Sequence, residues 1–409
     1  MNKYSKRIAI LGAGGLGVCT ALELASRGFH VDLYEEYSKP IRKASFVNEG
    51  KIHLGFIYAM DKDFYTSREM IIAALHFVNH LKRWIDVKPE ELISTPFNYL
   101  VHKGSLMNGD QLNAHYTKCK DFFREAKDHY KLKYLDLFDS IEVAPIARGK
   151  FDHIANPEFI DDVFLTNEYS VEPRTIAYEL EKALVANPSI QLILNARVTG
   201  VTRTNSQLEV SFEKDGKINT AKYAEVINST WSGMLEIDRT MGIEPLYAWS
   251  FRYKFGNKIL IPFEGNQFHS CTMVQGPFGD AVNFKGKGGF FSWYPIGRTG
   301  WSEEHNPPRW DEMYTDEERF EIFSRSFEQL TLRIPSLKNV TFRKENVNPV
   351  GGVIFALGNK DVDTESSKLH TRHEVGIRTY DGYHTVNTGK YTLIPYLAVK
   401  VADRIEGKS

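Results

Sequence analysis

The sequence has few cysteines and no long apolar run. Its 409 residues include only Cys19, Cys119 and Cys271, which lie far apart and form no C-x-x-C pair. We therefore expect neither a disulfide framework nor a zinc site, and a reducing compartment. No apolar run reaches the ~18 residues that cross a membrane. The start, MNKYSKRIAILGAGG, lacks the apolar stretch of a secretory signal. These absences predict a cytoplasmic protein with no integral membrane segment.

The chain also lacks a surplus of either charge. Its 51 Lys and Arg residues face 52 Asp and Glu residues, which gives a formal net charge of −1. A protein that binds nucleic acid through its phosphates needs a basic surplus, so we expect no nucleic-acid partner. A length of 409 residues with 42% hydrophobic residues predicts more than one domain.

The first part of the chain has the pattern of a βαβ unit. Residues 7–11 (RIAIL) form a short apolar strand, and residues 15–27 show helical periodicity that Gly28 ends. Residues 30–34 (HVDLY) form a second strand. Because the strands flank one crossover helix, we expect them to be parallel neighbours in an α/β sheet.

A glycine-rich turn joins the first strand to the helix. Gly12-Ala13-Gly14-Gly15-Leu16-Gly17 fits G-x-G-x-x-G, in which the glycines allow a tight turn, close approach of a pyrophosphate and close helix packing. The N-terminus of the helix supplies free N–H groups for the phosphates. Glu35 ends the second strand about 20 residues further on, where a carboxylate accepts hydrogen bonds from ribose hydroxyls. Together these features predict a dinucleotide site.

Several segments resemble one family of flavoenzymes. GAGGLGVCTALELASRGFHVDLYEE, followed by KASFVNEGKIHLGFIYA, is similar to FAD-dependent oxidoreductases of the D-amino acid oxidase type. That superfamily includes glycine and sarcosine oxidases, L-2-hydroxyglutarate dehydrogenase and flavin glycerol-3-phosphate dehydrogenase. The tail TGKYTLIP resembles the family's last motif, a turn into the final helix that points at the flavin. Val198 and the strand at 226–230 match family positions near the adenosine, but Trp231 stands where a small residue is usual.

The resemblance implies a fold and a cofactor. We expect an α/β protein with a discontinuous, Rossmann-like FAD-binding domain and an inserted α+β substrate domain built on an antiparallel sheet. Relatives that tether FAD covalently carry a His at about position 47, where this chain has Val47, so we expect non-covalent FAD and a simple buried thiol at Cys271. The predicted FAD-binding domain comprises residues 1–92, 165–238 and 347–409, and the substrate domain comprises residues 93–164 and 239–346.

The resemblance and the glycine motif together assign the cofactor residues. They come from the glycine turn, the end of the second strand, the segment that follows it, an adenine-contacting strand and the final turn. The predicted FAD-binding residues are Gly12, Gly14, Gly15, Gly17, Glu35, Glu36, Lys43, Ala44, Ser45, Asn48, Val198, Gly389, Lys390, Tyr391 and Thr392.

His53 and Arg372 are the candidate catalytic residues. His53 lies in IHLGFIY, which resembles the I-H-x-G-x-x-Y stretch of the hydroxyglutarate and glycerophosphate enzymes, and a His of near-neutral pKa can accept a hydroxyl proton. It could instead hydrogen-bond flavin or backbone without catalysis. Arg372 precedes the final turn and suits a substrate anion, although a surface ion pair is the ordinary alternative. The candidate substrate residues, for which core packing is an alternative, are Arg252, Tyr253, Trp293 and Tyr294.

The predicted reaction is hydride transfer from a CH–OH carbon of a small polar metabolite, such as a 2-hydroxy acid or sugar derivative, to flavin N5. Amine or amino-acid oxidation is the near alternative. An NAD-dependent dehydrogenase and a non-catalytic flavoprotein are two others. The electron acceptor, O2 or another, stays open. We expect no metal site, because His76 and His80 have helical ligand spacing but lack the Glu of H-E-x-x-H.

Overall fold

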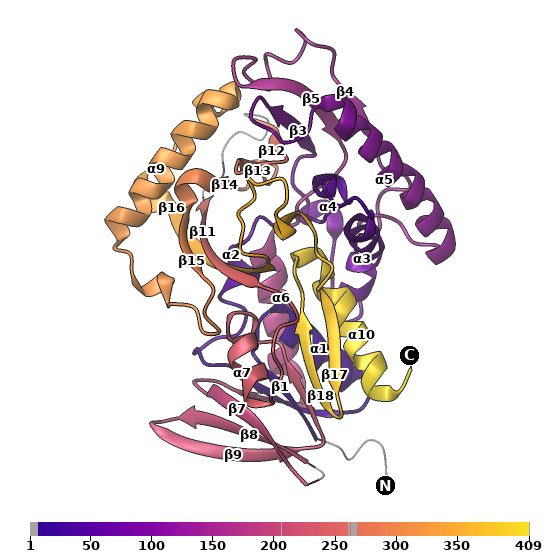
Figure 1. Ribbon diagram of the computed structural model, residues 1–409, viewed down its shortest axis with the longest axis vertical. Coiled ribbons are helices and arrows are strands. Elements are labelled where there is room, and N and C mark those ends of the chain that lie inside the picture. Colours follow the sequence, from indigo (N-terminus) through magenta and orange to yellow (C-terminus); the bar gives the residue numbers. More distant parts are fainter. Residues whose placement is uncertain (1–6, 206, 261, 263–267, 409) are drawn as a thin grey trace.

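A parallel sheet forms one half of the protein. The computed structural model describes residues 7–205, 207–260, 262 and 268–408 (Figure 1). All neighbours in a six-stranded sheet pair in parallel except the edge pair β17–β18. The last four residues of β1 are buried, as expected for an apolar strand covered on both faces. In order, the strands are β17 (Gly376–Tyr380), β18 (Tyr383–Asn387), β10 (Glu225–Asn228), β1 (Arg7–Leu11), β2 (His30–Tyr34) and β6 (Ile190–Ile193).

A nine-stranded sheet forms the other half. Its neighbours pair antiparallel except β12 and β3, which are parallel. The predicted α/β class with a second, antiparallel sheet is confirmed. In order, the strands are β15 (Arg298–Ser302), β11 (Trp249–Ile259), β14 (Gly289–Trp293), β13 (Gly279–Asn283), β12 (Ser270–Met273), β3 (Phe97–His102), β5 (Ile160–Thr166) and β4 (Val143–Pro145), with β16 (Val347–Leu357) paired to β11.

Strand β16 lies in the larger sheet, although its sequence falls in the stretch that we assigned to the cofactor domain. It pairs with β11 along its whole length, from Val347 opposite Ile259 to Leu357 opposite Trp249. The two sheets also share one hydrophobic core, which combines Ile10 and Leu33 of the parallel sheet with Phe97 and Phe290 of the other. The division into two domains at the stated boundaries stays a prediction.

A small three-stranded sheet lies beyond the parallel sheet (Figure 1). After its last strand the chain leaves this sheet and enters the parallel sheet as β10, beside β1. The reason is visible in burial, because the hairpin strand is mostly exposed whereas Val226–Asn228 are buried. The small sheet consists of β7 (Arg197–Thr204), β8 (Gln207–Lys214) and β9 (Lys217–Tyr223).

Helices cover both sheets (Figure 1). Helix α1 packs against α6 and α10, and α3 packs against α10 and α5, while α9 lies along the nine-stranded sheet. No helix in the described part of the chain is long and apolar enough to cross a membrane. The helices are α1 (Gly15–Ser26), α2 (Ala44–Val47), α3 (Tyr65–Leu81), α4 (Pro89–Leu92), α5 (Gly109–Tyr130), α6 (Pro173–Ala186), α7 (Met234–Thr240), α8 (Tyr294–Gly297), α9 (Asp316–Arg333) and α10 (Ile394–Glu406), with short 3-10 turns that include η2 (Phe56–Tyr58), η3 (Trp231–Gly233), η4 (Trp310–Glu312) and η8 (Tyr391–Leu393).

Candidate active site

A cavity of about 740 Å³ lies where the two sheets meet. Its walls come from the glycine turn, the segment after β2, strands β11 and β16, and the turn before α10. Most of the residues predicted from the sequence line it. These are Gly12, Gly14, Gly15, Glu35, Glu36, Lys43, Ala44, Ser45, Asn48, His53, Val198, Tyr253, Arg372, Gly389, Lys390 and Tyr391.

The glycine turn has the geometry that its sequence predicts. Gly12 has a φ of +89°, which favours glycine, and a Cβ on Gly17 would lie 1.9 Å from the Gly12 carbonyl oxygen. Gly17 therefore lets α1 pack close to the turn without lining the cavity itself. A Cβ on Gly14, in contrast, would meet nothing within 4 Å. The turn thus leaves open space at Gly14 and directs the N-terminus of α1 towards the cavity, as an anion site requires.

Glu35 closes the turn from the end of β2. Its carboxylate accepts hydrogen bonds from the N–H groups of Ala13 at 2.9 Å and Tyr37 at 3.1 Å. Burial raises the pKa of Glu35, and these N–H groups act in the opposite direction. Because each carboxylate oxygen has two lone pairs, the side chain keeps capacity for further donors on its cavity side.

The segment after β2 lies against β16. A Cβ on Gly352 would approach the Val47 side chain to 3.0 Å, so glycine allows this close contact. Val47 lines the cavity and carries no nucleophile. Cys271 is a buried free thiol outside the cavity lining, and burial raises its pKa to about 12.

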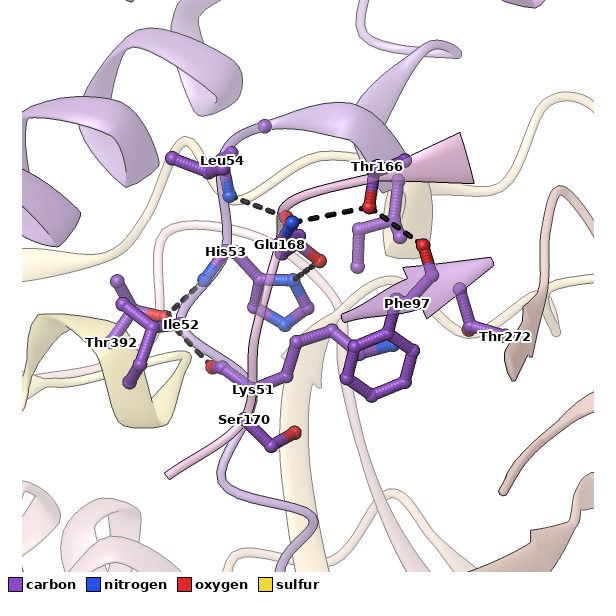
Figure 2. A network of polar contacts seen from close by, with 12 residues as sticks. Lys51, Ile52, His53, Leu54, Phe97, Thr166, Glu168, Ser170, Thr272 and Thr392 are labelled. Atoms are coloured by element: carbon purple, nitrogen blue, oxygen red, sulfur yellow. Dashed lines mark hydrogen bonds and ion pairs between the residues drawn. The ribbon is translucent and has the colours of Figure 1, made fainter. Parts of the chain in front are cut away.

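The turn before α10 is tied to the His53 segment. Gly389 has a φ of +63°, and Thr392 lies behind the cavity wall. The Thr392 hydroxyl accepts a hydrogen bond from the His53 N–H at 3.0 Å and donates one to the Lys51 carbonyl at 3.1 Å (Figure 2). Thr392 thereby holds the backbone of His53 in place.

His53 is buried beside a buried carboxylate. Its Nδ1 lies 3.8 Å from the Oε1 atom of Glu168, which is itself completely buried (Figure 2). Burial lowers the pKa of His53, with Glu168 acting in the opposite direction. Burial alone would raise the pKa of Glu168, but His53, Lys51 and the Leu54 N–H together lower it. A neutral imidazole therefore faces an ionised carboxylate.

Cationic side chains gather on the cavity wall around one anion. Lys254, Lys390 and Arg372 all line the cavity, as does Glu49. Burial and the neighbouring Arg372 lower the pKa of Lys390 to about 8. Burial and Asp280 would raise the pKa of Glu49, but the lysines around it bring the pKa below its usual value. This part of the cavity can bind an anion and still holds one carboxylate.

Arg372 is fixed by its backbone neighbours. The Nη1 atom of its guanidinium donates to the carbonyls of Leu369 at 2.6 Å and Thr371 at 2.7 Å. The backbone N–H of Arg372 donates to the Thr66 hydroxyl at 3.0 Å. The Nε of Arg372 has no hydrogen-bond partner among the described residues. A guanidinium held in this way keeps a second edge for a bidentate partner.

One group of potential metal ligands lies next to Arg372. Ligand atoms of Asp61, Asp63 and His373 lie within 4.8 Å of one another. The Asp61 carboxylate already accepts a hydrogen bond from the Thr66 N–H at 2.8 Å and lies 3.2 Å from His373 Nε2. We interpret the group as a cap of α3 that also anchors the Arg372 segment.

Three of the four predicted substrate residues lie outside the cavity lining, and Tyr253 is the exception. The Arg252 guanidinium donates to the Tyr294 hydroxyl at 3.0 Å, and this hydroxyl donates to Asp361 at 2.6 Å. Trp293 instead packs under the guanidinium of Arg333, 4.3 Å from its ring centre. The substrate roles of Arg252, Trp293 and Tyr294 stay predictions.

Sequence reasoning did not single out Glu168 or Lys254, and it placed Glu49 only within the segment that follows the second strand. Glu168 comes two residues after β5, which itself carries Asp161 and Asp162, so no local signal sets Glu168 apart from other acidic residues. Trp231, noted from the sequence as unusual, has a φ of +57°, which explains why a small residue suits this position. Its indole N–H donates to the Val353 carbonyl at 2.7 Å and ties η3 to β16.

A parallel sheet with a glycine turn, beside a cavity lined by a histidine and by cationic side chains, has the features of a dinucleotide-binding protein. Residues 7–353 match the family described as FAD dependent oxidoreductase (DAO), and the chain belongs to this family. The cofactor is therefore FAD. The residues present fit this cofactor, because the open space at Gly14 and the N-terminus of α1, where the Gly15 N–H donates to the Ser45 hydroxyl at 3.1 Å, suit a diphosphate.

Solved structures of similar fold come from several enzymes. Glycine oxidase from Geobacillus kaustophilus is 14% identical, with a TM-score of 0.67 over 99% of this chain and 96% of that one. L-amino acid deaminase from Proteus vulgaris is 13% identical, with a TM-score of 0.67 over 99% and 94%. L-alpha-glycerophosphate oxidase from Mycoplasma pneumoniae is 13% identical, with a TM-score of 0.64 over 98% and 94%. These likenesses establish the fold alone.

One curated relative shares a short stretch. The FAD-dependent monooxygenase FPY4 of Fusarium mangiferae is 29% identical over 96 residues, which cover 24% of this chain and 25% of that protein. The match therefore spans about a quarter of the relative's length.

Proposed function

We propose that this protein oxidises a CH–OH carbon of a small anionic metabolite, such as a 2-hydroxy acid or an acidic sugar derivative. Bound FAD supplies the hydride acceptor for such a reaction. The observation that carries the proposal is the pairing of a neutral, buried His53 with Arg372 at one end of the cavity. Both flank Tyr58, whose ring centre lies 6.0 Å from the His53 ring centre and 6.0 Å from the Arg372 guanidinium carbon.

His53 would accept the hydroxyl proton. A base must be unprotonated before it can act, and burial lowers the pKa of His53, so the ring is neutral at physiological pH. Arg372 would bind the substrate anion through its free Nε edge. Lys390 and Lys254 would add positive charge beside the anion.

Amine oxidation is the second candidate, and Glu49 favours it. This carboxylate lines the cavity and stays ionised, because the surrounding lysines lower its pKa. The ammonium group of an amine substrate would pair with the Glu49 carboxylate, whereas the hydroxyl of an alcohol needs no anionic partner. The fold likeness to glycine oxidase does not decide between the two substrates.

The test is anaerobic reduction of the bound flavin by a panel of hydroxy acids, sugar acids and amino acids, followed as loss of the yellow absorbance. We expect reduction by a hydroxy acid and a large loss of rate in His53→Ala. His153→Ala, at an exposed position, is the matched control. Reduction by amines alone would rule out the hydroxyl preference and leave amine oxidation.

Three further points belong to the proposal. FAD is bound without a covalent link, so acid precipitation should leave all flavin in the supernatant. The protein acts in the cytoplasm, and it needs neither a metal nor a nucleic acid. Its electron acceptor is O2 or another oxidant, such as a quinone or a second protein, and reoxidation assays can separate these.

A further inference from the structure

We propose that Glu168 is the positioning residue of His53. Its buried carboxylate accepts the Nδ1–H of the imidazole, so the Nε2 lone pair is the one available as base. This inference rests on the proposed function, because it assigns the partner of the base proposed there. Glu168 would not touch the substrate and would act only through His53.

Geometry places Glu168 on the Nδ1 side of the ring. The Nδ1 atom is buried and has no hydrogen-bond partner among the described residues, and the Glu168 carboxylate is 3.8 Å away. That separation exceeds a hydrogen bond, so the proposed contact requires the His53 ring to rotate towards the carboxylate. His53 also lines the cavity, so its other edge is the one available to a substrate.

The carboxylate itself is held firmly. Its Oε2 accepts the Leu54 N–H at 2.6 Å (Figure 2). Its Oε1 accepts the Tyr99 hydroxyl at 2.5 Å. The Glu168 N–H donates to the Thr166 hydroxyl at 3.1 Å, which fixes the backbone. An anion with these partners stays in place when the ring beside it changes charge.

The charges around His53 also support its pairing with Glu168. The charged groups that act on His53 are Glu168, which favours its protonation, and Lys51 and Lys390, which oppose it together with burial. The neighbouring phenols of Tyr58 and Tyr99 are neutral, because burial raises the pKa of each. Among these groups, Glu168 is the anion that can stabilise the imidazolium formed when His53 takes a proton.

The first test uses the unmodified holoenzyme. A nitrogen-15 spectrum of labelled histidine, with the His53 signals identified by their loss in His53→Ala, reports which ring nitrogen carries the proton. We expect Nδ1–H at neutral pH. An Nε2–H tautomer overturns the proposal. The tautomer is read from the unmodified protein, and His53→Ala serves only to assign the His53 signals.

The second test is Glu168→Gln, which keeps the shape and removes the charge. We expect the His53 titration midpoint to fall by about one pH unit or more, as expected when an opposite charge this close is lost. The acidic limb of kcat/KM should move by the same amount, and kcat should fall about tenfold or more while KM changes little. Glu158→Gln, the same substitution at an exposed position, should leave the midpoint unchanged.

The outcomes separate the two proposals. An unchanged midpoint in Glu168→Gln overturns the role of Glu168, even if His53→Ala abolishes flavin reduction. A shifted midpoint together with full flavin reduction by His53→Ala supports the pairing and removes His53 as the base, so that the proposed function fails separately.

Discussion

The surroundings of single side chains in the cavity decide their charge and their orientation. Burial keeps His53 neutral, the lysines around Glu49 keep it ionised, and backbone carbonyls fix Arg372. Each effect comes from a few named neighbours. Point substitutions can therefore test them one at a time.

Arg372→Lys is the first prediction at this scale. Lysine keeps the charge but has no planar fork, and it would release the Leu369 and Thr371 carbonyls. We expect KM for an anionic substrate to rise about tenfold or more, since a hydrogen bond to a charged group contributes ~1.5–3 kcal/mol. Lys368→Gln, exposed on the same segment, is the control. Steady-state kinetics with an unchanged KM would contradict the role of Arg372.

The second prediction is that the stability of the protein depends on pH through His80. Burial, with His76 and Arg83 adding to it, lowers the pKa of His80 to about 3 from 6.5. The unfolded chain takes up a proton below pH 6.5 and the folded protein does not, so stability falls as the pH drops from 6.5 towards 3. The slope from this group is ~1.4 kcal/mol per pH unit.

Urea unfolding at several pH values measures this dependence. His80→Phe should flatten the curve in that window, and His153→Gln, at an exposed position, should not. Equal slopes in His80→Phe and the unmodified protein would show that His80 takes up its proton in the folded state.

Helix α1 and the glycine turn before it illustrate how an element serves two purposes. Gly17 lets the helix approach the turn, whereas Gly14 leaves space at its N-terminus. Gly14 is also the N-cap residue of α1, and because glycine has no side chain, the helix has no side-chain cap at this position. Packing and binding therefore depend on different glycines of one motif.

Gly17→Ala and Gly14→Ala separate these purposes in the third prediction. The first places a Cβ 1.9 Å from the Gly12 carbonyl oxygen, so we expect the free energy of unfolding of the FAD-free protein to fall by about 1–3 kcal/mol. The second meets nothing within 4 Å and should leave that stability within about 0.5 kcal/mol. Its methyl group would stand where a diphosphate approaches, so the Kd for FAD should rise about tenfold or more.

Thermal unfolding and flavin titration measure the two effects. If Gly14→Ala binds FAD as tightly as the unmodified protein, the cofactor does not pass close to this turn.

At the scale of the whole molecule, the cavity exists because the two sheets meet. The stretch around η4 reaches the segment that follows β2, where Asp311 pairs with Lys43 and Arg309 pairs with Glu36 at 3.4 Å. All four side chains are partly exposed. These contacts close one end of the cavity.

We expect Asp311→Asn to raise the dissociation rate of FAD about twofold to fivefold at low salt, because an exposed pair contributes ~0.2–1 kcal/mol. At about 1 M salt the difference should vanish, since screening removes the attraction in both proteins. Recovery of flavin fluorescence after dilution measures the rate, and Glu317→Gln on α9 is the control. A difference that persists in high salt would assign the effect to packing.

The sequence by itself determined the features that depend on neighbours along the chain. The turn at Gly12–Gly17, the strands around it and Glu35 are all local, and their spacing predicted a parallel sheet with a dinucleotide site. The family likeness extended this prediction to His53, Lys390 and Arg372, all of which line one cavity.

Only the tertiary structure decided which distant side chains meet. Glu168 lies 114 residues from Leu54 in the chain and yet accepts its N–H. Arg252 and Tyr294 bond to each other outside the cavity lining, while Lys254 lines it. Strand β16 joined the larger sheet because it pairs with β11. The physical reason is the same each time. The register between strands that are remote in sequence sets where a side chain points, and the local sequence does not determine that register.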